Sequence, residues 1–374
     1  MKLFNILILV TFLLAGCKEE YIPKVTSSEQ SVLVVEGNLN SGTGPTSIRL
    51  SRTFKLDDSA QLRPETGAQL VVEGKNGTAF PLYDMFSNGQ YYAYQLLLDG
   101  ADQYRLRITT ATGKEYLSDY IPVLKNPPID SISWKQNNNG VQIYINTHNP
   151  EGDTRYYRWE YEETWENRSA YFSNYKLVNG QPVRRTPDEN VYECWKYFNS
   201  PIIIVGSTVR LAEDRVAEMP LIFIPDESDK LSVRYSVLVR QYVLDKSGYE
   251  FYQLMKKNTE SLGSIFDAQP SESGGNIHAI SDAAEPVIGY ITAAPVHEQR
   301  IFITKDQVRD WKFFMDCSIV VEVPNNPESF PEYFNGDFLP YSADEPMVTK
   351  YFAAHKECVD CTLRGGTTQR PSYW

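Results

Sequence analysis

Short runs of β-branched and aromatic residues, separated by turn residues, constrain the fold of this chain more than any other feature. Residues 31–37, 48–53 and 70–73 are such runs, and in 48–53 apolar and polar side chains alternate as in a half-buried strand. Asn76-Gly77 is a strong hairpin-turn signal before the next run. Tyr is abundant, with 25 copies, whereas Leu-rich helical stretches are scarce. We therefore expect a mainly β fold.

Two domains are expected from the spacing of these runs. Residues 31–125 contain six or seven short strand-like runs, which is typical of an immunoglobulin- or prealbumin-like β-sandwich. Asn126-Pro127-Pro128 then stiffens the chain and removes two N–H donors, as suits a joint between domains. Residues 126–374 are too long for a bare sandwich. They are predicted to form a larger β-sandwich-type domain with a helical insertion.

The helical insertion is expected near residues 247–262. Ser247 and Glu250 have the spacing of a capping box, and Gly263 is a stop signal. Apolar side chains recur at helical spacing between these signals, so the helix is predicted to lie on the sheet.

The N-terminal segment carries signals of export and membrane attachment. Lys2 precedes an apolar run from Leu3 to Leu14, which as a helix would rise about 18 Å, too little to cross a hydrocarbon core of roughly 30 Å. Residues 1–16 are therefore predicted to be a signal peptide. Leu14-Ala15-Gly16-Cys17 resembles a bacterial lipobox, which implies cleavage before Cys17 and acylation of that cysteine. The alternative is an ordinary secretory signal with an incidental cysteine.

Residues 17–30 are predicted to form the lipidated N-terminus and a linker. Lys18, Glu19 and Glu20 resemble the export signal that takes Bacteroidota lipoproteins to the outer cell surface. The alternative is a polar linker that lifts the domain off the bilayer. Two or three acyl chains, at about 0.8 kcal/mol per buried CH₂, make a stable anchor. We expect a lipid-anchored outer-membrane protein that faces the exterior, with the periplasmic face as the alternative.

The net charge of the chain limits the classes of partner that it is expected to bind. Lys and Arg number 36 against 48 Asp and Glu, a net charge of −12. Nucleic-acid affinity depends on neutralised phosphates, so an acidic chain is not expected to bind nucleic acid. The acidic charge also argues against membrane binding through a polybasic surface, so the acyl anchor is the expected membrane contact.

Four cysteines remain after the lipidation cysteine: Cys194, Cys317, Cys358 and Cys361. Outside the cytoplasm disulfides are the default, and four cysteines allow three connectivities. The favoured arrangement pins the C-terminal tail back to Cys194 and Cys317. A zinc site that includes His355 and a redox-active Cys358–Cys361 pair are the alternatives. No metal or cofactor is expected.

One strand combines an aromatic and a charged face. Tyr157, Trp159, Tyr161 and Trp165 alternate with polar or charged residues within residues 156–166. Aromatic rings can stack on sugar rings, so these four residues are candidates for a ligand-binding platform. The alternative, favoured by the regular alternation, is a core face on which each ring buries about 150–250 Å².

Catalytic motifs are missing from the sequence. It contains neither a Gly-x-Ser-x-Gly elbow nor a His-Glu-x-x-His helix, and no phosphate loop or dinucleotide fingerprint. No catalytic residue is assigned, and an enzyme is the less favoured class. Asp58-Ser59-Ala60 and Asp130-Ser131-Ile132 resemble the Bacteroidota O-glycosylation motif, which makes Ser59 and Ser131 candidate modification sites.

Several blocks resemble an outer-membrane lipoprotein family of the Bacteroidota known as domain of unknown function 4249. The blocks are residues 33–37, 50–53, 157–160, 163–165, 240–242, 257–260, 263–267, 269–271, 275–277, 287–290, 358–361, 364–367 and 371–374. The family has no established activity, so no catalytic residues carry over. The resemblance implies a lipoprotein commonly encoded beside a TonB-dependent transporter.

The expected function is therefore that of a lipid-anchored binding or accessory protein, associated with a TonB-dependent transporter in nutrient capture. An extracytoplasmic hydrolase acting on glycan or peptide, and a structural envelope protein, are the alternatives.

Overall fold

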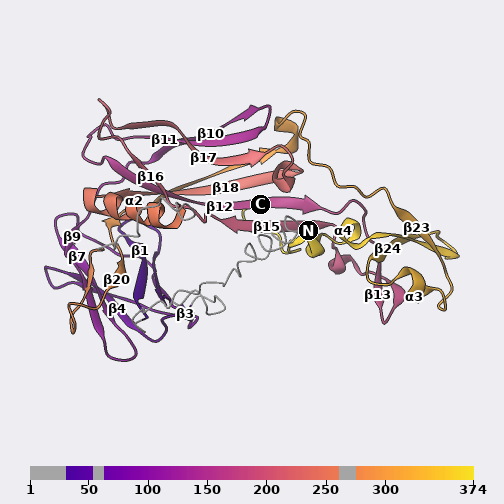
Figure 1. The fold of residues 1–374 in the computed structure, drawn as a ribbon, viewed down its shortest axis with the longest axis horizontal. Helices are drawn as coiled ribbons and strands as arrows, with labels where there is room; N and C mark the ends of the chain where they lie inside the picture. Colours follow the sequence, from indigo (N-terminus) through magenta and orange to yellow (C-terminus); the bar gives the residue numbers. More distant parts are fainter. Residues whose placement is uncertain (1–30, 54–62, 261–274) are drawn as a thin grey trace, which may run out of the picture.

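Two β-sandwiches and a smaller lobe make up the structure, a computed structural model that describes residues 31–53, 63–260 and 275–374 (Figure 1). The expectation of a mainly β fold with β-sandwich architecture is confirmed. Over the described ranges, the helices all lack the length and apolar character that crossing a membrane requires.

The first sandwich consists of two sheets of short strands. These strands are β1 (Leu33–Asn40), β2 (Thr46–Arg52), β3 (Arg63–Pro64), β4 (Gln69–Gly74), β5 (Ala79–Leu82), β6 (Gln90–Ala93), β7 (Gln103–Thr109), β8 (Glu115–Ser118), β9 (Ile121–Pro122), β19 (Ile277–Ala279), β20 (Val287–Gly289) and β21 (Ala293–Ala294). One sheet has the order β20-β1-β2-β3, with β21 on β1 and β6 on β2. The other has the order β19-β8-β7-β4-β5, with β9 on β7. Alternate residues of β7, namely Tyr104, Leu106 and Ile108, point into the shared core.

Residues 277–294 complete this sandwich from far along the chain. β20 and β21 run parallel to β1, and β19 runs antiparallel to β8. The predicted division, with 31–125 as one domain and 126–374 as the other, is therefore corrected: the first domain also includes a returning segment. A parallel pairing needs a long crossover and has no local turn signal, so the sequence does not reveal it.

The second sandwich follows the Asn126-Pro127-Pro128 joint. Its strands are β10 (Ile129–Asn137), β11 (Gly140–His148), β12 (Tyr156–Arg168), β15 (Glu193–Asn199), β16 (Ile204–Ser207), β17 (Arg215–Pro225), β18 (Arg234–Leu244) and β22 (His297–Thr304). One sheet has the order β10-β11-β17, and the other has the order β15-β12-β18-β22, with β16 also on β12. The rings of β12 and the aliphatic side chains of β11 fill the space between the two sheets. Short 3-10 turns lie at Pro187–Glu189, Asp229–Leu231, Lys305–Gln307 and Cys361–Arg364.

The predicted helix is present as α2 (Lys246–Glu260). It contacts β12, β16 and β18, so it lies on the sheet as expected and occupies the region between the two sandwiches (Figure 1). The cap differs from the prediction. The carboxylate of Asp245, rather than Ser247, accepts the backbone N–H of Gly248 at 2.8 Å. The predicted stop at Gly263 falls outside the described residues.

The smaller lobe is a separate body within the predicted second domain. It contains the hairpin β13 (Tyr175–Val178) and β14 (Gln181–Arg184), the sheet β23 (Val320–Pro324), β25 (Lys350–His355) and β24 (Phe338–Ala343), and the short helices α3 (Phe330–Tyr333) and α4 (Lys356–Val359). Phe330, Tyr351 and Val323 form its own small core.

Two disulfides connect the C-terminal tail to the body. Cys194 bonds to Cys361, and Cys317 bonds to Cys358. The favoured arrangement, with the tail pinned to Cys194 and Cys317, is confirmed. A zinc site and a redox-active Cys358–Cys361 pair do not fit these pairings, because each sulfur is already bonded to a distant partner.

Candidate functional site

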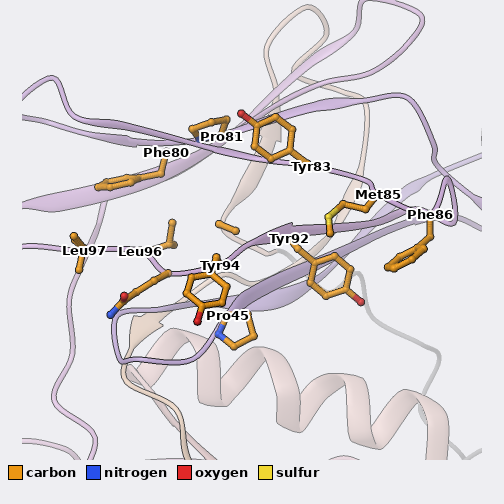
Figure 2. A pocket seen from close by; sticks show the side chains of 12 residues that line it. Pro45, Phe80, Pro81, Tyr83, Met85, Phe86, Tyr92, Tyr94, Leu96 and Leu97 are labelled. Carbon is orange, nitrogen blue, oxygen red and sulfur yellow. The ribbon is translucent and has the colours of Figure 1, made fainter.

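An apolar groove lies on the first sandwich, with a volume of about 670 Å³ (Figure 2). We define the apolar groove by its lining residues Pro81, Tyr83, Met85, Phe86, Tyr94 and Leu97. These side chains are strongly exposed: Tyr94 by 90%, Phe86 by 71% and Met85 by 68%. A cluster of large apolar side chains in water is typical of an interaction surface.

Local backbone structure presents the groove side chains. Tyr83 and Tyr92 exchange two backbone hydrogen bonds of 2.9 Å, which join the ends of β5 and β6. In the turn between them, the carboxylate of Asp84 accepts the N–H groups of Asn88 and Gly89, both at 3.1 Å. Gly89 has a φ of +76°, and a Cβ there would lie 2.6 Å from the carbonyl oxygen of Leu50, so this turn requires glycine. The turn is thus built before any partner arrives.

A second hollow, the polar cleft, lies between the two sandwiches and beneath α2, with a volume of about 500 Å³. We define it by Glu36 and Arg49 of the first sandwich, by Arg158, Glu160, Glu162 and Arg240 of the second, and by Tyr252 of α2. Strand register brings these groups together. β12 and β18 pair so that Arg158 lies opposite Tyr242 and Glu160 lies opposite Arg240.

Arg158 is the most enclosed charge of the polar cleft. Its guanidinium lies over the rings of Tyr242 and Tyr252, at 4.2 and 4.8 Å from their centroids, and forms an ion pair with Glu160. Its Nε–H is buried and has no hydrogen-bond acceptor among the residues that the structure describes. The cleft therefore holds a positive charge whose donors are incompletely satisfied.

The other charges of this wall are paired. Arg240 donates to Glu162 at 2.6 Å and to Glu298 at 3.2 Å. The hydroxyl of Tyr242 donates to Glu160 at 2.9 Å. The result is a row of alternating guanidinium and carboxylate groups on the outer face of the second sandwich.

Burial and neighbouring charges set the protonation states of three groups in the polar cleft. Burial alone would raise the pKa of Glu160, but the Arg158 guanidinium and the Tyr242 hydroxyl outweigh it, and the pKa is lowered. Burial raises the pKa of the Tyr242 and Tyr252 hydroxyls above the usual range. These groups therefore hold fixed protonation states at neutral pH, whereas a general acid or base works best with a pKa near neutrality.

The residues predicted as sites are distributed as follows. Tyr157, Trp159, Tyr161 and Trp165 are all at most 8% exposed and lie in the core of the second sandwich. The ligand-platform interpretation is corrected accordingly, since regular alternation gives a buried face. Ser131 is exposed on β10, and its hydroxyl accepts the Asn146 side chain at 3.2 Å.

Several predicted sites fall outside the described residues: Cys17, Lys18, Glu19, Glu20 and Ser59. Within the described ranges, no group of three or more His, Cys, Asp and Glu side chains is arranged to hold a metal ion.

Sequence reasoning missed both hollows. The sequence suggested a binding site on the aromatic face of β12. Arg158 and Glu160, on the charged face of the same strand, line the polar cleft. The block at 157–160 contains these two residues and the block at 240–242 contains Arg240, so the blocks that resemble the family were the available signal. For the apolar groove, the available signal was Met85-Phe86 within a turn-rich segment, where large apolar residues are unexpected.

Comparisons with known proteins show a family. A family model described as "Domain of unknown function (DUF4249)" matches residues 18–300. A segment of two fibronectin type-III domains from chicken tenascin is 11% identical, covers 57% of this chain and 97% of that chain, and has a TM-score of 0.16. A structure of manganese lipoxygenase of Gaeumannomyces graminis with part of zonadhesin of Komagataella pastoris is 10% identical, covers 57% and 79% of the two chains, and has a TM-score of 0.17. Similarities this weak carry no argument about function. No curated protein matches the chain.

Proposed function

The chain belongs to the DUF4249 family, and on that premise we propose that it is a lipid-anchored outer-membrane protein that faces the cell exterior and assists a TonB-dependent transporter in nutrient capture. The lipobox-like Leu14-Ala15-Gly16-Cys17 and the following Lys18-Glu19-Glu20 support the location. Under this proposal the protein is a binding or accessory subunit and performs no chemistry.

The apolar groove is the observation that carries the binding role. Met85, Phe86 and Tyr94 keep more than two thirds of their surface in water. Large exposed apolar patches mark protein or membrane contacts, and interface centres are enriched in Tyr, Phe and Met. The preformed turn lowers the entropy that a partner would have to remove.

A protein partner suits the groove better than a lipid surface. The chain carries a net charge of −12, which opposes contact with anionic lipid. The anchor limits the choice of partner further. Residues 17–30 reach at most about 50 Å when fully extended, so the first sandwich stays close to the membrane that holds the transporter.

The hydrolase alternative is not favoured by the carboxylates of the polar cleft. In the polar cleft, Glu160 and Glu162 are each occupied by an arginine, and the pKa of Glu160 is lowered rather than raised as a general acid requires.

Co-purification from native membranes tests the proposal. The protein is captured in mild detergent through an epitope inserted at Gly180, in the exposed turn of the smaller lobe, and its partners are identified by mass spectrometry. The variant Met85→Ser/Phe86→Ser removes two groove side chains. The control Phe314→Ser/Met347→Ser removes the same residue types at other exposed sites, where they are 81% and 78% exposed.

We expect a TonB-dependent transporter with the unaltered chain and with the control, and its loss with the groove variant. All three proteins should melt at the same temperature, because the changed side chains are exposed. The proposal is overturned if no such transporter is recovered at native expression. The groove assignment is overturned if both variants retain it.

A further inference from the structure

Two rows of polar side chains face each other across the polar cleft. On the first sandwich, register places Glu36 opposite Arg49, and Arg49 opposite Gln90. On the second sandwich, Glu160 lies opposite Arg240, and Arg240 lies opposite Glu298. Each row crosses three neighbouring strands, and α2 closes the space between them.

The charges that line the cleft cancel. Among the described residues, three arginines (Arg49, Arg158, Arg240) and three glutamates (Glu36, Glu160, Glu162) line it. A ligand with a net charge would gain from one set and be repelled by the other. A charged ligand would also have to displace Glu160 from Arg158 or Glu162 from Arg240, and breaking such a partly buried pair is costly.

Hydrogen-bonding capacity nevertheless remains. The carboxylates of Glu160 and Glu162 keep about two fifths of their side-chain surface in water, so their oxygens can accept further hydrogen bonds. Groups that both donate and accept, such as hydroxyls, can add to these pairs without separating them. The Tyr252 ring, Met255 and Ile202 supply apolar surface for C–H faces in the same space.

We propose that the polar cleft binds an uncharged polyhydroxylated small molecule, a sugar of one or two rings, bridged between the two sandwiches. A volume of about 500 Å³ lies within the range of small-molecule sites, about 300–1,000 Å³. This inference does not depend on the transporter. The polar cleft is a different surface from the apolar groove, and the inference gives the cleft a class of ligand.

Isothermal titration calorimetry on the full-length protein in detergent tests the proposal. The probes are neutral mono- and disaccharides of glucose, galactose, mannose, xylose and fructose, with N-acetylneuraminic acid as an anionic probe and Ala-Ala as a zwitterionic one. Gln90→Ala alters the first wall, and Glu162→Ala alters the second. Glu218→Ala is the control. Glu218 is a half-exposed glutamate on β17 that pairs with Lys135, and it lies outside the cleft.

We expect saturable binding of at least one neutral sugar, weakened about tenfold by Gln90→Ala and by Glu162→Ala and unchanged by Glu218→Ala. Hydrogen exchange with that sugar should slow in β1 and β12 together, because the ligand touches both walls. The proposal is overturned if no neutral sugar binds at millimolar concentration, if N-acetylneuraminic acid or Ala-Ala binds more tightly with the same variant dependence, or if only one wall matters. All three variants should retain the transporter, so failure here and failure of the proposed function are distinguishable.

Discussion

Trp159 and Gln241 are joined by a buried hydrogen bond in which the indole Nε1–H donates to the side-chain oxygen of Gln241 at 2.9 Å. The amide nitrogen of Gln241 in turn donates to the carbonyl of Pro127 at 2.7 Å. A single side chain on β18 thus connects the core of the second sandwich to the joint that leads from the first.

Replacing this amide should destabilise the protein. Gln241→Leu leaves the Trp159 N–H and the Pro127 carbonyl without partners in the core, which costs about 1–3 kcal/mol for each buried group left unpaired. Urea unfolding measures the free energy of unfolding. Gln253→Leu, at an exposed position on α2, is the matched control and should change it by less than about 0.5 kcal/mol. Equal effects of the two variants would show that the Gln241 contacts contribute nothing.

Removal of Lys230 should be more costly. Glu163 is 1% exposed, and it accepts from the Lys230 ammonium at 2.7 Å and from the Tyr235 hydroxyl at 2.7 Å. Lys230→Met leaves the buried carboxylate without its cationic partner, and we expect the free energy of unfolding to fall by about 3–5 kcal/mol. The same change at Lys135, whose pair with Glu218 is exposed, should cost at most about 1 kcal/mol. Comparable losses at both sites would refute this prediction.

The two disulfides should differ in their contributions. Cys194 and Cys361 are separated by 167 residues and Cys317 and Cys358 by 41, so the chain-entropy model gives about 5 and about 4 kcal/mol. The paired variants Cys194→Ala/Cys361→Ala and Cys317→Ala/Cys358→Ala are compared with the unaltered chain by urea unfolding under oxidising conditions. Adding a reductant should remove most of the difference in the free energy of unfolding between the unaltered chain and the two paired variants. A variant that unfolds at the same urea concentration as the oxidised parent would contradict it.

Asp344 should titrate at unusually low pH. The hydroxyl of Thr349 and the backbone N–H groups of Lys350 and Thr349 donate to its carboxylate and lower its pKa to about 2. Because the folded pKa lies below the ordinary value of 3.8, this stabilisation is present above that value and is lost as the pH falls through about 2. Carboxyl NMR titration measures the midpoint. Thr349→Val should raise it, whereas Thr112→Val in the first sandwich should not. An Asp344 midpoint near 3.8 in the unaltered chain would rule the effect out.

Acylation of Cys17 can be checked by intact mass and cell fractionation. Cys17→Ala should remove the lipid mass and release the chain from the membrane fraction, since no other membrane contact is expected. Replacing Lys18, Glu19 and Glu20 together by alanine should keep the anchor but abolish digestion by protease added outside the cell. Membrane retention of Cys17→Ala would disprove the lipobox interpretation.

Local sequence patterns predicted the elements whose causes are local. Alternation in residues 48–53 predicted β2 to within two residues, and Asn76-Gly77 marks a real turn, with Gly77 at a φ of +89°. Helical spacing placed α2 to within two residues at each end. In each case the signal and the structure that it forms lie within one stretch of chain.

Features made by distant segments were not predictable in this way. β20 is a run of three residues whose role as a partner of β1 depends on a pairing between residues 254 positions apart, Leu33 and Val287. The polar cleft needs Glu36, Arg158 and Tyr252 from three separate elements. The alternation in β12 showed two faces and favoured the aromatic one as the buried face, in keeping with the larger gain from burying aromatic rings.

The return of residues 277–294 to the first sandwich affects how this protein is made. As the chain is synthesised the N-terminal strands emerge first, but β1 has an open edge until β20 and β21 arrive, after most of the second sandwich has been made. An unpaired edge strand recruits other strands, including those of neighbouring chains. The first strand of the chain to be made is therefore among the last to be fully paired, and its edge stays open until then.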